Sequence, residues 1–180
     1  MIVPDAIEPI VGWRCWNLND AWRLESLING RDTPWRPGVR KEATCCSELL
    51  SSLRASLPPE TIAQLELKPE DADLLREHAA PHEFCSCGIY AAKDLDTLQK
   101  VAFPEPIVGE VYLWGKVIPG ENGYRAQYAY PKSLRLVTKN ALDVKLEQLR
   151  AYCDDVGVMN PSEAWIWPED APGGAMGEVV

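Results

Sequence analysis

Residues that commonly bind metal ions are concentrated in one part of this chain. Four of its six cysteines and both of its histidines fall between positions 45 and 87, namely Cys45, Cys46, His78, His82, Cys85 and Cys87. Thiolate sulfur and imidazole nitrogen are the ligands that tetrahedral Zn²⁺ sites use. The sequence therefore predicts one Cys3His site, with Zn²⁺ as a structural cofactor.

The spacing of these residues narrows the ligand set without fixing it. Cys85 and Cys87 are close enough to bind one ion, and Gly88 lets the backbone turn tightly beside them. One member of the Cys45–Cys46 pair is expected to supply the third thiolate, and one of the two histidines the imidazole. The alternatives are buried free cysteines, which pack as small apolar side chains, and a reactive thiol.

The metal site is predicted to be structural rather than catalytic. A closed site with four protein ligands usually stabilises a fold, whereas a catalytic zinc keeps one position open. Glu83 would be the base beside an open position, but the chain contains neither H-E-x-x-H nor the deaminase pattern H-x-E with P-C-x-x-C. It also contains no nucleophile elbow, phosphate loop or dinucleotide motif. A protein without catalytic activity is therefore favoured over an enzyme.

Aromatic side chains suggest a second site. The chain has seven Trp and six Tyr but only two Phe, and Trp and Tyr combine apolar area with a polar group that suits a binding surface. Such rings beside Arg can stack on a base or hold an anionic ligand. The candidate ligand-binding residues are Trp13, Trp16, Trp35, Trp114, Tyr124 and Arg125. The alternative is that these rings form the core of a small twisted sheet.

The strands that would position these residues are indicated by alternation and turn signals. They are expected over 10–18, with a hairpin partner at 21–28, and over 107–118 and 123–138, joined by a loop at 119–123. In the first strand, Trp13 and Cys15 share one face, and Arg14 and Trp16 the other.

Helices complete an α+β fold. They are expected over 44–57, 94–102 and 141–152, with Asp94 capping the second. The predicted architecture is an antiparallel, partly closed, barrel-like β-sheet with about three helices and one structural zinc site. Zinc would tie the first helix to the Cys85–Cys87 loop.

Length, charge and hydropathy limit the classes of protein that fit. The 180 residues suit one domain over 1–153 and an acidic C-terminal extension over 154–180, whose last residues are expected to be mobile. A net charge of −9 argues against general nucleic-acid binding, which needs a basic surface.

The chain has no apolar run of about 18 residues and no basic signal region at its start, so neither a membrane span nor secretion is predicted. The expected location is the cytoplasm, where clustered cysteines indicate metal sites rather than disulfides.

Several short motifs resemble those of a family of uncharacterised actinobacterial and phage proteins. The matching segments are Gly12-Trp13-Arg14, the loop around Trp35, His78-x-Ala80-Pro81, Cys85-x-Cys87-Gly-Ile-Tyr90-Ala, Leu113-Trp114-Gly115 and Gly123-Tyr124-Arg125-Ala126. The family has no established activity, so the resemblance implies no catalytic residue. It implies His78 rather than His82 as the metal ligand, because the match includes H-x-A-P. The run from Cys87 to Val137 also resembles the small β-barrel of PUA-like domains.

Three functions are compatible with these observations. The favoured one is a zinc-stabilised, non-enzymatic binding module for a protein or for a small anionic or nucleotide ligand. The first alternative is a zinc-dependent hydrolase with an open metal position and Glu83 as base. The second is an anti-defence protein of the phage type, whose acidic surface mimics DNA.

Overall fold

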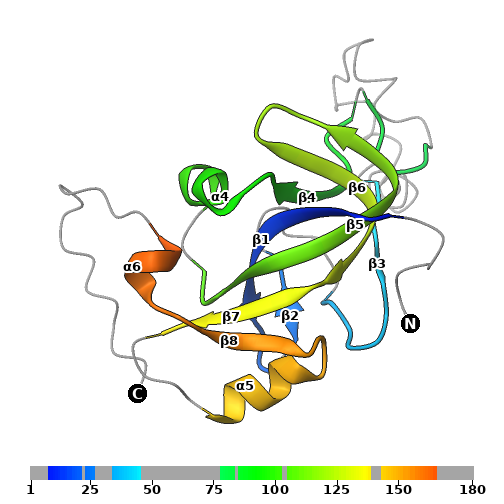
Figure 1. Ribbon diagram of the computed structural model, residues 1–180. Helices are drawn as coiled ribbons and strands as arrows, with labels where there is room; N and C mark the ends of the chain where they lie inside the picture. Colours follow the sequence, from blue (N-terminus) through cyan, green and yellow to red (C-terminus); the bar gives the residue numbers. More distant parts are fainter. Residues whose placement is uncertain are drawn as a thin grey trace, which may run out of the picture.

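The fold is organised around a small barrel of four antiparallel strands (Figure 1). A computed structural model of the chain describes residues 8–21, 23–26, 34–45, 78–83, 85–102, 105–138 and 143–165. The barrel strands are β1 (Ile10–Leu18), β4 (Ile89–Ala92), β5 (Ile107–Pro119) and β6 (Gly123–Pro131). Both β1 and β6 pair with β4 and with β5, so the sheet closes on itself. The predicted α+β fold with a barrel-like antiparallel sheet is confirmed.

Shorter strands extend this barrel. β2 (Leu24–Glu25) pairs with the end of β1, and β3 (Lys41–Glu42) pairs with β6. β7 (Ser133–Val137) pairs with β5, and β8 (Asp155–Met159) runs parallel to β7. The sequence does not predict β8, which lies within the range 154–180 assigned to a C-terminal extension. The first part of that range therefore contributes to the sheet.

β5 and β6 form the predicted long hairpin, with two irregularities. Gly115 has a φ of +74°, and the register with β6 shifts beside it, which is the geometry of a β-bulge. The single strand predicted over 123–138 is wrong in one respect, because the structure divides it into β6 and β7. Pro131 ends β6, since it has no backbone N–H to continue the ladder. The N–H of Lys132 then donates to Glu110 O at 2.8 Å before β7 resumes pairing with β5.

Three helices lie in the described part of the chain, α4 (Leu95–Val101), α5 (Asp143–Arg150) and α6 (Pro161–Ala164). α4 begins where predicted, because the Asp94 carboxylate accepts a hydrogen bond from Thr97 N–H at 2.7 Å. α4 packs beside β1 and β4, and α5 beside β8 (Figure 1). The helix predicted over 44–57 lies, from residue 46 on, outside the described residues. None of the described helices is long and apolar enough to cross a lipid bilayer.

The two faces of β1 contribute to different apolar clusters. Trp16 is completely buried and meets Trp35 edge to face, with 5.6 Å between the ring centroids. Their cluster also contains buried side chains of β5, β6, β7 and α5. Cys15 and Trp13 belong to a second cluster, which includes Leu98 of α4. The alternation predicted for this strand is therefore confirmed.

Candidate metal centre

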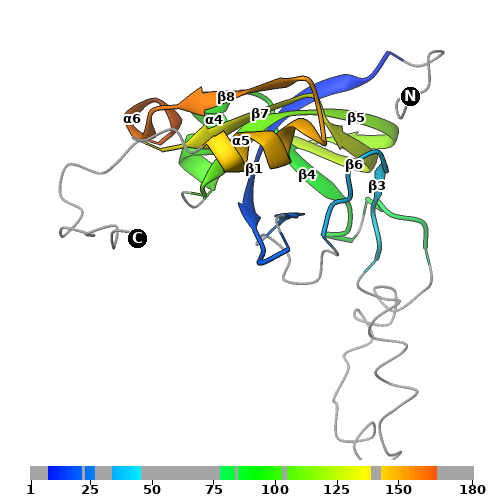
Figure 2. The same cartoon turned by 90° about the horizontal axis from the view of Figure 1, so that it is seen from below.

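The candidate metal ligands lie where two strands meet along one edge of β6. β3 ends opposite Tyr128 of β6, and β4 begins opposite Ala126 of the same strand. The chain therefore leaves the sheet just before Cys45 and re-enters it just after Cys87. These two segments lie on the same side of the sheet in Figure 2. Long-range pairing with β6 thus brings together cysteines that are far apart in the sequence.

A group of three cysteines and one histidine converges at this place. The ligand atoms of Cys45, His78, Cys85 and Cys87 all lie within 4.8 Å of one another. Cys45 Sγ is 3.8 Å from Cys85 Sγ and 3.0 Å from His78 Nε2, and Cys87 Sγ is 3.4 Å from the same nitrogen. Tetrahedral zinc, with bonds of about 2.3 Å to sulfur and about 2.0 Å to nitrogen, separates its ligands by about 3.5 to 3.8 Å. The chain therefore contains a Cys3His group that could hold a metal ion.

The surroundings of this group shift the thiol pKa values in opposite directions. Burial acts to raise the pKa of Cys85, but hydrogen bonds from Cys87, His78 and Cys45 outweigh it and lower that pKa to about 7. Burial raises the pKa of Cys87 to about 12. Without a cation Cys85 therefore ionises more readily than Cys87, whose thiol is held neutral by burial and by repulsion from neighbouring negative charge. A divalent cation removes this repulsion and stabilises all three thiolates together.

Arg125 and Gly88 hold the loop that carries two of the sulfurs. Nη1 of Arg125 donates to the backbone carbonyls of His82 (3.2 Å), Cys85 and Cys87 (3.3 Å). Gly88 has a φ of +126°, and a Cβ there would lie 3.1 Å from the Cβ of Arg125. Glycine thus allows both the left-handed backbone and the close approach of β6. The tight turn predicted at Gly88 is confirmed.

The remaining metal-ligand candidates are placed differently. The ring centroid of His82 is 4.6 Å from that of His78, but His82 is not part of the converging group. The structure thus brings in the histidine that the resemblance implies. Cys46, the alternative to Cys45, lies outside the described residues. Glu83, the candidate base, is exposed.

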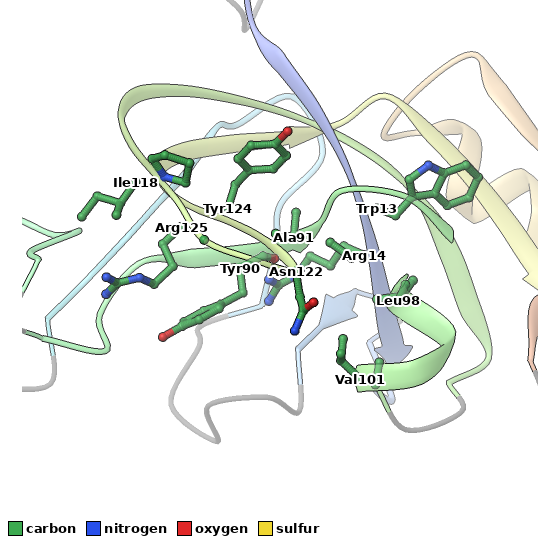
Figure 3. A pocket seen from close by; sticks show the side chains of 15 residues that line it. Trp13, Arg14, Tyr90, Ala91, Leu98, Val101, Ile118, Asn122, Tyr124 and Arg125 are labelled. Atoms are coloured by element: carbon green, nitrogen blue, oxygen red, sulfur yellow. Dashed lines mark hydrogen bonds between the residues drawn. The ribbon is translucent and has the colours of Figure 1, made fainter. Parts of the chain in front are cut away.

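The six candidate ligand-binding residues fall into two sets. Trp16, Trp35 and Trp114 are at most 3% exposed and pack in the interior of the fold. Trp13, Tyr124 and Arg125 line a cavity of about 410 Å³ (Figure 3). This cavity lies between α4, β1, β4 and the tip of the β5–β6 hairpin. Only the second set is therefore placed to contact a ligand there.

Sequence reasoning misses other residues of this cavity, including Tyr90, Val101 and Asn122. They come from a strand, a helix end and a hairpin turn that only the folded barrel brings together, so no spacing in the sequence indicates them. Tyr90 also connects the cavity to the metal group, because its hydroxyl donates to the carbonyl of Ser86 at 2.6 Å.

Comparisons of the chain with protein-family models, with curated proteins and with solved structures found no match. The Cys3His group and the adjacent cavity are therefore the features from which a function can be inferred.

Proposed function

We propose that this protein is a binding module without catalytic activity, stabilised by a structural Zn²⁺ ion. The supporting observation is the convergence of Cys45, His78, Cys85 and Cys87, whose ligand atoms lie within 4.8 Å of one another. Sulfur and imidazole donors favour Zn²⁺ over Mg²⁺ or Ca²⁺, which prefer oxygen. Bound zinc would join the segment after β3 to the segment before β4.

The donor set favours a structural ion over a hydrolytic one. Four protein ligands complete a tetrahedral shell and leave no position for a water molecule. Glu83, which a hydrolase would use as a base, is exposed and does not belong to the converging group. An ion in this group would therefore stabilise the fold rather than activate water.

Metal content and coordination test the proposal. The full chain is purified without a metal-chelating tag and studied by elemental analysis and by X-ray absorption at the zinc edge. We expect one zinc ion per chain, with three sulfur neighbours and one nitrogen neighbour, as the Cys3His group requires. A metal-free protein would contradict the zinc site. An oxygen neighbour in place of one protein ligand would instead support a hydrolase.

The two adjacent histidines provide a matched pair of variants. His78→Gln removes a proposed ligand, whereas His82→Gln removes an imidazole whose centroid is only 4.6 Å away. During dialysis against a chelator, His82→Gln should retain its zinc like the unmodified protein, and His78→Gln should lose it. Equal retention by the two variants would show that His78 does not bind the ion.

A further inference from the structure

The cavity beside the metal group has the size and wall composition of a small-molecule site (Figure 3). Its volume of about 410 Å³ lies within the range of roughly 300–1,000 Å³ that is typical of ligand pockets. α4 contributes Leu98 and Val101 to the wall, and three different strands contribute the residues Trp13, Tyr90 and Tyr124. The wall is therefore mainly apolar and aromatic.

The charge of this wall is opposite in sign to that of the protein. The chain has a net charge of −9, yet the lining residues that the structure describes include two arginines, Arg14 and Arg125, and no acid. Arg14 is only 3% exposed and donates hydrogen bonds to Tyr90 O and Ser26 Oγ, so its charge is fixed in place and its field is weakly screened by water and salt. The amide of Asn122, another lining residue, lies between Tyr90 and Val101 in Figure 3 and adds a hydrogen-bonding group. This combination favours an anionic ligand over a neutral or cationic one.

The aromatic residues indicate the shape of that ligand. Trp13 of β1 and Tyr90 of β4 project from the same face of the sheet, because Trp13 pairs with Ala92, two positions after Tyr90, and aromatic faces pack well against planar groups. We propose that the cavity binds a planar aromatic or heteroaromatic group that carries a negative charge. The rings of Trp13 and Tyr90 contact the plane of the ligand. The guanidinium groups of Arg14 and Arg125 are held by protein hydrogen bonds, so they favour the negative charge of the ligand through their electric field.

This ligand site rests on the proposed function, because the loop that contains Cys85 and Cys87 holds two residues of the cavity wall in place. Nη1 of Arg125 donates to the carbonyls of Cys85 and Cys87, and the Tyr90 hydroxyl donates to Ser86 O. Removal of zinc should release this loop and weaken ligand binding as well as stability.

Calorimetric titration of the full chain tests the ligand class. The probes are naphthalene-2-carboxylate, its neutral carboxamide, adenosine monophosphate and neutral adenosine, so that a free aromatic acid and a nucleotide are each matched to an uncharged analogue. We expect at least one anion to bind about tenfold more tightly than its neutral counterpart. Equal binding of the neutral compounds, or no binding of either anion at millimolar concentration, would overturn the proposal.

Zinc content measured on the same samples separates the two proposals. Protein that contains one zinc ion but binds neither anion would overturn the ligand site and leave the metal site standing. Protein that binds an anion but contains no zinc would support the cavity and contradict the metal-stabilised module. Ligand binding that survives zinc removal unchanged would contradict the coupling between them.

Val101 allows a charge test with little risk to folding. It lines the cavity from the last position of α4 and is 58% exposed. Val101→Glu adds a negative charge there, and Val101→Gln adds a side chain of similar size without charge. The anionic probe should bind about fivefold more weakly to Val101→Glu than to Val101→Gln, and high salt should reduce the difference.

Val158→Glu is the control for net charge, because Val158 is 42% exposed on β8, which contributes no residue to the cavity. This control should bind the probe like the unmodified protein. Equal affinity of Val101→Glu and Val101→Gln would show that the anion does not occupy the cavity.

Discussion

Cys45 is the ligand that closes the longest stretch of chain within the metal group. The other three ligands share one segment before β4, whereas Cys45 precedes His78 by 33 positions and Cys85 by 40. Cys45→Ser therefore removes the cross-link that the ion makes between Cys45 and the distant segment that contains His78 and Cys85. Cys87→Ser leaves that cross-link in place, because Cys45 stays joined to His78 and Cys85 through the ion.

The size of this effect follows from the loop that the ion closes. The chain-entropy relation for a cross-link over 33 to 40 residues gives a stabilisation of about 4 kcal/mol at 25 °C. In a chain of 180 residues this corresponds to a shift in Tm of about 10 °C. Closure from His78 to Cys87 spans only 9 positions, so Cys87→Ser should lose less.

The assay is thermal and urea unfolding in reducing buffer at saturating zinc. Cys153→Ser is the matched control, because Cys153 is half-buried and outside the metal group. The expected order of stability is control, then Cys87→Ser, then Cys45→Ser. A chelator removes both closures, so it should lower the unmodified protein to the level of Cys45→Ser or below it. If Cys45→Ser is no less stable than Cys87→Ser, the ion does not cross-link the two segments.

Three further substitutions test the structure around the site. Gly88→Ala should lower stability by about 1–3 kcal/mol and speed zinc loss to a chelator, because its φ of +126° suits only glycine; unchanged zinc retention would contradict this. Tyr152→Phe should cost about 2 kcal/mol in urea unfolding, since the buried hydroxyl donates to Trp35 O (2.8 Å) and accepts from Leu24 N–H (3.3 Å); a negligible loss would refute the role of these bonds. Asp94→Asn should lower Tm at pH 7, because hydrogen bonds at the helix start hold the pKa of the Asp94 carboxyl below its ordinary 3.8. That stabilisation is present above the unfolded pKa and is lost as pH falls through the lower folded value, so a gap in Tm that persists at pH 2 would argue against it.

Elements with a strong local pattern are predictable from the sequence. β1 alternates between two apolar faces, and α4 starts at Asp94 because an aspartate there satisfies a backbone N–H of the first turn. β8 has no such pattern, since none of its five residues is buried. It forms because β7 offers a parallel partner, which only the tertiary fold determines.

The metal group also combines features that the sequence predicts with features that only the tertiary fold determines. Its ligand types follow from composition, and Cys85 and Cys87 are neighbours in the chain. Cys45 joins them because β3 and β4 pair with adjoining positions of β6, a relation that sequence spacing does not encode. His78 and His82 lie side by side, with 4.6 Å between their centroids, yet of the two only His78 contributes a ring nitrogen to the group, which their spacing in the sequence does not reveal.

Barrel closure also constrains the order in which the chain can fold during its synthesis. The main partner of β1 is β5, with Ile10 opposite Leu113 and Trp16 opposite Ile107. At a translation rate of about 5–20 residues per second, β5 leaves the ribosome about 5 to 20 s after β1. The apolar side chains of β1 are available to chaperones, or to other nascent chains, during that interval.

The four proposed zinc ligands all precede β5, so the metal group can assemble while β1 still lacks its main partner. Zinc would then hold the ends of β3 and β4 together before β6 emerges to pair with both. The supply of zinc during translation would therefore influence how much of the newly made protein reaches the closed barrel.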